Sequence, residues 1–290
     1  NTDRLSMMKA VGQSWSGCVE ARRQPYDAQE DAPVAATPAT MYTPYFWPDE
    51  PDNGSSQSTL NSYKTDGGSS SLGWAQRQAR TAKYAGGTIT GGTFSFLNMT
   101  YTKGPNAGCA LQPIIPLTTD TAAIKTGIDN MTAIGETNIP LGLMWGWNAV
   151  GPTPLLSAQG SAYGTPHLKK IVILMTDGEN TLFDSNNTND SYYGGLGYVW
   201  QGMLSGITGS SSTTQRTTAM NNRLTQLCTN MKARKIEIYT VRVEVTSGSS
   251  TLLQGCASAP DKFFDVANVN QLGSAFDAIA AAITNLRITK

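Results

Sequence analysis

The chain has 290 residues, only 14% of them charged, and its 21 basic and 21 acidic side chains give a formal net charge of zero. A chain of this length can bury a sizeable core in one large domain or two small ones. The sequence has no basic stripe of the kind that binds nucleic acid, and no apolar run long enough to span a bilayer. Because it opens with NTDRL and has no signal-peptide pattern, we expect it to be a processed part of a longer protein.

Residues 1–18 are expected to lead into the main domain, and residues 19–108 to form a long insertion. The insertion contains turn-rich stretches such as KTDGGSSSLG. Because structureless stretches of this length are uncommon inside compact domains, we expect the insertion to carry small elements of its own. The sequence indicates a short helix at 75–84 and a strand-like segment at 88–101.

Residues 109–290 alternate apolar segments regularly and are expected to form the core domain. A strand is predicted at 110–117, and Thr119 or Asp120 can cap the helix that follows it. The apolar face of this helix consists of Ile124, Ile128 and Met131. Apolar periodicity predicts further helices at 139–150, 213–234, 251–257 and from 272 onward, and strands at 170–175, 236–245 and 263–266.

Strands that alternate with helices form a mainly parallel sheet covered by helices, so the predicted fold class is α/β. The apolar run IVILM at 171–175 fits this class, because strands of such a sheet are buried on both faces. Residues 181–212 form a second, polar surface excursion. Its aromatic residues, for which packing is favoured over ligand binding, are Tyr192, Tyr193, Tyr198 and Trp200.

The four cysteines form no CxxC motif, and the one histidine cannot complete a zinc site with them. Their wide spacing favours two disulfides, Cys18–Cys109 and Cys228–Cys256, over the other pairings, and reduced buried thiols are the remaining alternative. Each disulfide would stabilise the fold by about 3–4 kcal/mol and would require an oxidising compartment.

Asp177 directly follows the apolar run, and Gly178 allows a sharp turn there. Open parallel sheets bind ligands at the carboxyl ends of their strands. The sequence GETN at 135–138 opens a helix expected to pack beside this sheet, so Thr137 should reach the same edge. The Thr137 hydroxyl and the Asp177 carboxylate are hard oxygen donors that suit Mg²⁺, Mn²⁺ or Ca²⁺. Both residues could instead serve as an ordinary helix cap or turn cap.

A helix that opens with Thr137, followed by a buried strand ending in TDG, resembles a von Willebrand factor A domain. The resemblance covers about residues 110–290 and implies a Rossmann-like fold with a metal-ion-dependent adhesion site. In that family the cation is bound by a DxSxS loop after the first strand, by a later Thr and by the Asp of TDG. Thr137 matches the Thr role and Asp177 the Asp role. No DxSxS occurs in this sequence, so we expect the first central strand to be missing and the cation to bind at low occupancy.

Three further phrases are similar to TadG-like proteins of bacterial Tad/Flp pilus systems: WSGCVEAR at 15–22, PYFWPDEPD at 44–52 and GPNAGCALQPIIPLTTD at 104–120. This resemblance implies an extracytoplasmic location in the periplasm or at the cell surface. It also implies contact with the membrane only through an anchor that precedes these residues.

The function expected first is a non-enzymatic binding or adhesion module of the pilus assembly system, with a protein partner or a cell-surface ligand and no nucleic acid. The alternative is a structural scaffold or subunit of an extracellular assembly with a vestigial metal site. Its sheet would be completed by its own upstream segment or by another chain. A secreted hydrolase that uses His167 is a minor alternative, because no GxSxG nucleophile elbow accompanies this histidine.

Overall fold

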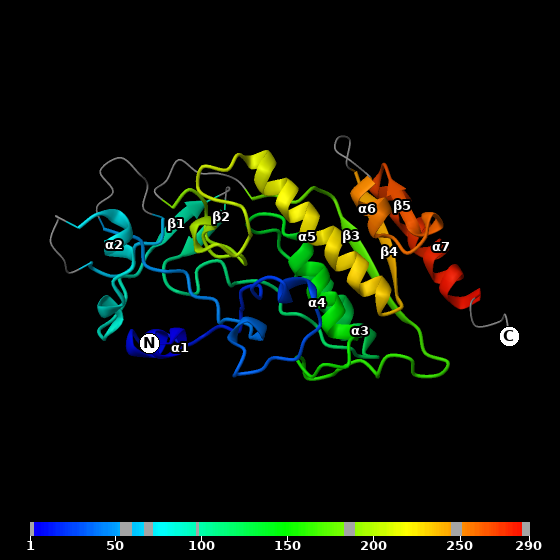
Figure 1. The fold of residues 1–290 in the computed structure, drawn as a ribbon, viewed down its shortest axis with the longest axis horizontal. Coiled ribbons are helices and arrows are strands. Elements are labelled where there is room, and N and C mark those ends of the chain that lie inside the picture. The colour runs from blue at the N-terminus through cyan, green and yellow to red at the C-terminus, as the bar shows by residue number, and fades with distance from the viewer. Residues whose placement is uncertain are drawn as a thin grey trace.

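A computed structural model describes residues 3–52, 60–66, 72–96, 99–182, 189–244 and 251–285. The molecule is elongated, with the α/β core toward the C-terminal end and the insertion at the opposite end (Figure 1). Among the helices described, none is long and apolar enough to cross a membrane.

The core contains a three-stranded sheet in the order β3-β4-β5. β3 (Lys170–Thr176), β4 (Ile236–Val243) and β5 (Phe263–Val266) are all parallel to their neighbours. β4 lies in the middle and is rich in β-branched residues, which pack well on a sheet buried on both faces. The predicted α/β class with a parallel sheet is therefore confirmed.

Helices cover both faces of this sheet. α4 (Ile139–Val150), α5 (Thr213–Ala233) and the short α6 (Thr251–Cys256) lie on one face, and α7 (Leu272–Asn285) lies on the other. α4 is apolar nearly all round because it packs against β3 of the sheet, against α5 and against the 3₁₀ turn at Tyr26–Ala28. α5 begins with a capping box in which Ser212 and Gln215 satisfy each other's backbone amides.

β3 forms the edge of the sheet among the described residues, although its sequence is that of an interior strand. Its pairing partner is β4, on one side. Val172 is buried against α4 and α5, but Ile173 and Met175 are 38% and 51% exposed. This edge carries neither of the usual protections, a proline or a charge in mid-strand.

The strand predicted at 110–117 is wrong, because this segment has no regular structure. A strand requires a neighbour to accept its backbone hydrogen bonds, and no described strand pairs with this segment. Its apolar residues Leu111, Ile114 and Leu117 are accordingly exposed. The helix after it, α3 (Thr121–Asp129), forms as predicted and is capped by Asp120. The predicted apolar face of this helix is largely uncovered, because Ile128 and Met131 are exposed.

The insertion carries its own small elements, as predicted. A helix that was not predicted, α1 (Arg4–Ala10), precedes it. The helix predicted at 75–84 is split into α2 (Trp74–Gln78) and a 3₁₀ turn at Thr81–Tyr84, because Arg80 has an extended backbone. The strand-like segment predicted at 88–101 forms a hairpin of β1 (Thr93–Phe96) and β2 (Met99–Thr102). The paired residues of β1 start at Thr93, directly after Gly92, which has a φ of 126°. Further 3₁₀ turns lie at Tyr26–Ala28, Pro38–Thr40, Val199–Gln201, Pro260–Lys262 and Val269–Gln271.

Both predicted disulfides are present. Cys18–Cys109 closes the base of the insertion, and Cys228–Cys256 joins α5 to α6. No free cysteine remains. The alternative of four reduced thiols is therefore excluded in this structure, which fits an oxidising compartment.

Candidate functional site at the carboxyl edge of the sheet

The loop after β3 turns sharply at the carboxyl edge of the sheet. The Thr176 hydroxyl accepts a hydrogen bond from the Gly178 amide at 3.1 Å and donates to the Gly178 carbonyl at 3.0 Å. These bonds fold the chain back immediately after the strand. Asp177 and Glu179, on either side of Gly178, are exposed at this edge.

The Thr137 loop and the Asp177 loop are joined by hydrogen bonds. The Thr137 amide donates to the Thr181 hydroxyl at 2.6 Å, and the Thr181 amide donates to the Thr137 carbonyl at 2.9 Å. Thr181 lies in the same loop as Asp177. The structure therefore brings the two loops that carry the predicted ligands to one edge of the sheet, whereas the ligand role of either residue stays a prediction.

Asn180 holds this junction in place, and the sequence analysis missed it. Its buried side chain accepts a hydrogen bond from the Ile139 amide at the start of α4, at 2.9 Å, and donates to Asn221 of α5 at 2.8 Å. Asn138 caps α4 by accepting from the Leu141 amide. No local signal distinguishes Asn180 from a loop asparagine, because both of its partners are distant in sequence.

The donors at this edge supply only part of a cation site. Mg²⁺ and Ca²⁺ take about six or more oxygen ligands. The Thr137 hydroxyl and the Asp177 carboxylate provide two groups, and in the described part of the chain no three His, Cys, Asp or Glu residues gather closely enough to hold a metal ion. The residues present therefore do not complete a metal site by themselves.

A small hollow of about 50 Å³ lies beside this edge. Arg242 lines it, and the Arg242 Nε donates to Asp265 on the neighbouring strand at 3.0 Å. Thr176, Arg242 and Asp265 occupy one row across the sheet, because they are partners in the strand register. The other residues around the hollow are Ile139, Gly178, Glu179, Asn221, Leu252 and Leu253. Since Arg242 is paired with Asp265, Asp177 and Glu179 give this edge a negative charge.

His167 lies at the opposite end of β3. It precedes the amino end of the strand in an exposed loop, with a φ of 61°. Asp177 follows the carboxyl end of the same strand. The predicted hydrolase histidine and the predicted ligand residues are thus separated by the length of β3, so they do not form one site.

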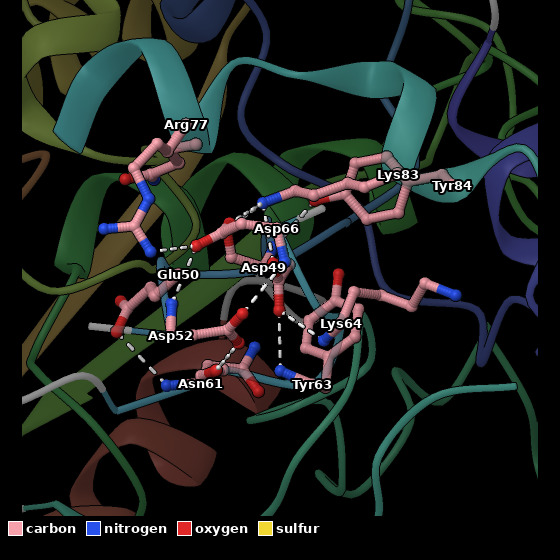
Figure 2. Close-up of polar contacts among 12 residues, drawn as sticks. Asp49, Glu50, Asp52, Asn61, Tyr63, Lys64, Asp66, Arg77, Lys83 and Tyr84 are labelled. Atoms are coloured by element: carbon pink, nitrogen blue, oxygen red, sulfur yellow. Dashed lines mark hydrogen bonds and ion pairs between the residues drawn. The ribbon is translucent and has the colours of Figure 1, made fainter. Parts of the chain in front are cut away.

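A second group of acidic residues lies in the insertion and is called here the Asp49 cluster (Figure 2). It consists of Asp49, Glu50, Asp52 and Asp66 with Arg77 and Lys83. The Lys83 ammonium is buried, donates to the Asp49 carboxylate at 2.6 Å and to the Asp49 carbonyl at 3.0 Å, and lies 3.5 Å from the Asp66 carboxylate. Arg77 pairs with the other oxygen of Asp66.

Backbone amides also donate to the carboxylates of the Asp49 cluster. Asp49 accepts hydrogen bonds from the Tyr63 and Lys64 amides, both at 2.6 Å. Asp52 and Asp66 each accept the other's backbone amide at 2.9 Å. Burial raises the pKa of the Asp49 carboxyl, although Lys83 and these amides oppose the shift. The Lys83 ammonium thus neutralises the buried carboxylates, and the cluster stabilises the fold of the insertion.

The insertion and the second excursion share one aromatic core. Trp47 of the insertion stacks on Tyr193 of the excursion, with ring centroids 5.8 Å apart, and its indole donates to the Tyr198 hydroxyl at 2.9 Å. The Tyr198 hydroxyl in turn donates to Glu50 at 2.8 Å. The other members of this core are Tyr45, Phe94, Tyr101, Ala107 and Cys109. The interpretation as packing residues is therefore confirmed for Tyr193 and Tyr198, whereas Trp200 stacks on Tyr198 but is 53% exposed.

No protein-family model matches the chain. No curated protein matches it either. Among solved structures, it is similar to the vWF domain of the type V pili tip protein Mfa5 from Porphyromonas gingivalis, with 18% identity, a TM-score of 0.39, and coverage of 60% of this chain and 76% of that one. It is also similar to proximal thread matrix protein 1 from the mussel byssus, with 17% identity, a TM-score of 0.32, and coverage of 68% of this chain and 35% of that one. A further structure of the mussel protein, with a zinc-occupied MIDAS motif, gives 17% identity, a TM-score of 0.33 and the same coverage. The chain thus spans about a third of the length of the mussel protein, 35%.

Proposed function

We propose that this chain is a non-enzymatic, extracytoplasmic binding or adhesion module of a Tad/Flp-type pilus system, built on a von Willebrand factor A-like domain. The observation that supports this best is the pair of hydrogen bonds between Thr137 and Thr181. They join the two loops that carry hydroxyl and carboxylate donors at the carboxyl edge of a parallel sheet, where such folds bind ligands. Two disulfides favour a location outside the cytoplasm.

In this proposal Thr137 and Asp177 contribute two oxygen ligands to a divalent cation. Waters, a partner carboxylate and a segment outside these 290 residues would complete the coordination, since hard cations prefer oxygen ligands. The negative charge left by Asp177 and Glu179 favours a cation here. Partner binding would then depend on the metal.

The test is binding of the purified chain to isolated Flp pili, measured by biolayer interferometry in Mg²⁺ and again in EDTA. We expect EDTA to abolish binding and Asp177→Asn to weaken it by about tenfold or more, because the substitution removes the ligand charge. Asp277→Asn, which removes a carboxylate at an exposed position of α7, is the matched control and should leave the affinity within about twofold. Equal affinity with and without EDTA would refute the metal-dependent function.

The second candidate is a structural subunit, and the exposed edge of β3 favours it. An apolar strand with free backbone groups is a template for strand addition. A strand from a second chain, or from a segment outside residues 1–290, would cover Ile173 and Met175 and pair with the edge of β3 that no described strand occupies. β3 would then be an interior strand of the sheet, as its apolar sequence IVILMT predicts.

Met175→Lys tests this candidate, because a charge on an edge strand opposes strand addition. Light scattering and electron microscopy of the concentrated chain should show ordered polymers that Met175→Lys prevents. Met131→Lys is the control, since Met131 is also exposed but lies outside any strand. Both substitutions should change the free energy of unfolding by less than about 0.5 kcal/mol, as is usual at exposed positions. A wild-type chain that stays monomeric, or equal effects of both variants, would count against a structural subunit.

A further inference from the structure

The ion pair between Lys83 and Asp49 is the most deeply buried one among the described residues (Figure 2). The Lys83 side chain is 1% exposed and that of Asp49 is 0% exposed. The lysine pair of the core, Lys262 with Glu237, has a similar distance of 2.7 Å but is 20% and 15% exposed. Burial disfavours the charged forms of amines and carboxylic acids, and it raises the pKa of the Asp49 carboxyl. The buried pair is therefore closer in free energy to a neutral amine and a neutral acid than an exposed pair is.

The Lys83 nitrogen is held against the Asp49 carboxyl group. Its Nζ lies 2.6 Å from Asp49 Oδ2 and 3.0 Å from the Asp49 backbone carbonyl oxygen, so two contacts to one residue orient it. The hydroxyl of the next residue, Tyr84, donates to the Asp49 backbone amide at 2.8 Å and fixes Asp49 from the same side of the chain. A desolvated lysine amine is a nucleophile, and holding it beside a carboxyl carbon removes most of the entropic cost of their reaction.

The other carboxyl oxygen of Asp49, Oδ1, accepts two backbone amides. Tyr63 and Lys64 each donate to it at 2.6 Å. Two such donors on one oxygen stabilise the negative charge that this oxygen gains when a nucleophile adds to the carboxyl carbon. Oδ2, which faces Lys83, is then the oxygen that can leave.

Asp66 lies where a proton carrier for this reaction would be needed. Its Oδ1 is 3.5 Å from the Lys83 Nζ. Its Oδ2 pairs with Arg77 and accepts the Asp52 amide at 2.9 Å, so the carboxylate is fixed in position. A carboxylate held beside both reacting groups can take a proton from the ammonium and deliver it to the leaving oxygen.

We propose that Lys83 and Asp49 form an intramolecular amide bond, with Asp66 as the proton carrier. Nζ gives a proton to Asp66 and adds to Cγ of Asp49. The Nζ–Cγ bond forms, the Cγ–Oδ2 bond breaks, and Oδ2 leaves as water with two of the three ammonium protons. The charges of the ammonium and the carboxylate cancel in the product, and no oxidant, metal or further reactant is consumed. This reaction is therefore independent of the site at Thr137 and Asp177.

The surroundings of the pair also fit the product. The charges of Lys83 and Asp49 disappear together, and Asp66 keeps Arg77 as its counter-ion, so no unpaired charge is left in the cluster. Oδ1 becomes the amide oxygen and keeps both of its backbone donors. The one N–H that remains on Nζ has the Asp49 backbone carbonyl within reach. The bond would close a loop between positions that are 34 residues apart in the insertion.

The intact mass of the purified chain tests the proposal, because an amide bond lowers the mass by one water molecule and an ion pair does not. The mass is measured in denaturant after both disulfides have been reduced. We expect a deficit of one water relative to the sequence. Trypsin does not cleave after an acylated lysine, so the digest should contain residues 24–64 joined to residues 81–103. A chain with the full mass of its sequence, or a deficit that maps to other peptides, would overturn the proposal.

Three variants assign the roles. Lys83→Arg keeps the positive charge but has no amine to add to the carboxyl carbon, so it should have the full mass of its sequence. The matched Lys262→Arg should keep the deficit. Asp66→Asn keeps the size of the side chain but cannot take the proton, so the linked fraction should fall by at least about tenfold. If Asp66→Asn fails to fold, Asp66→Glu should still form the bond. A deficit that persists in Lys83→Arg, or complete linkage in Asp66→Asn, would also overturn the proposal.

Discussion

Lys83 is the residue on which the Asp49 cluster depends most. It is buried, and its ammonium is shared by Asp49 and Asp66. Lys83→Met keeps the length of the side chain but leaves buried carboxylates without their cation. We expect a loss of about 3–5 kcal/mol in the free energy of unfolding, measured by urea denaturation, because breaking a buried ion pair from one side leaves an uncompensated charge.

Lys64→Met is the control for this prediction. Lys64 lies in the same part of the insertion and donates from its Nζ to the carbonyls of Gly86 and Thr88 at an exposed site. Its substitution should cost less than about 1 kcal/mol, since exposed polar contacts contribute little. Similar losses for Lys83→Met and Lys64→Met would show that the buried ion pair stabilises the fold no more than an exposed polar contact does. A cluster held by Lys83 should also be insensitive to EDTA.

The raised pKa of the Glu30 carboxyl predicts that the free energy of unfolding depends on pH. Burial raises its pKa above the ordinary value of 4.5, against the opposing effects of the Tyr163 hydroxyl, Arg234 and Lys170. The stability that protonated Glu30 contributes is therefore present below 4.5 and is lost as the pH rises through the folded pKa. Glu30→Gln is neutral at every pH, so its stability relative to wild type should increase between about pH 4 and about pH 7 in urea unfolding.

Glu237 should show the opposite sign and is the control for Glu30. Burial raises its pKa, but the hydrogen bonds from Lys262 and Tyr239 outweigh this and lower the pKa below 4.5. Its contribution is present above 4.5 and is lost as the pH falls through the folded pKa. Glu237→Gln should therefore be more destabilising at about pH 7 than at about pH 4. Parallel pH profiles for the two variants would contradict this assignment.

At the scale of elements, the core helices and strands could be predicted because their signals are local. The 139–150 helix was predicted at the bounds that α4 has, and the run IVILM identified β3. The strand predicted at 110–117 failed for a nonlocal reason, since a strand exists only where another strand pairs with it. The same cause explains why β3, whose sequence is that of an interior strand, lies at an edge among the described strands. The sequence pattern determines which faces of a strand are apolar, whereas the topology of the sheet determines which strands lie beside it.

The two disulfides differ in the length of chain that they close. Cys18 and Cys109 are separated by 91 residues, and Cys228 and Cys256 by 28. In the chain-entropy model the longer loop gives the larger stabilisation, so we expect losses of about 4–5 kcal/mol for the Cys18→Ala/Cys109→Ala pair and about 3–4 kcal/mol for the Cys228→Ala/Cys256→Ala pair. Urea unfolding of the two double variants measures both values. A reversed order would show that local packing, rather than loop length, determines these contributions.

At the scale of the whole molecule, the sequence predicted an insertion and an excursion but not that they form one unit. Trp47 and Tyr193 meet although they are far apart in the chain, and no spacing rule reports such a contact. The candidate site was predictable to the extent that it rests on local motifs: a strand end at Asp177 and a helix start at Thr137. Asn180, which holds these two loops, makes contacts that only the folded chain reveals.

The shared aromatic core predicts that the insertion and the α/β core unfold together. In a Trp145→Phe/Trp147→Phe background, which removes the tryptophans of α4, near-ultraviolet circular dichroism reports mainly the aromatic residues outside the α/β core, and the far-ultraviolet signal reports mainly helices such as α4, α5 and α7. We expect coincident urea transitions for the two signals, as in a two-state protein. Tyr198→Phe removes the donor to Glu50, so a buried acceptor loses a partner. The free energy of unfolding should fall by about 1–3 kcal/mol, and both transitions should move to lower urea concentration. Leu60→Ala is the control. Leu60 is half-buried and its backbone amide donates to the other Glu50 oxygen. The substitution keeps that amide, so the two transitions should stay coincident. Separate transitions in this background, with Tyr198→Phe moving only the near-ultraviolet one, would mean that the insertion folds as a unit of its own, joined to the core by contacts too weak to couple them.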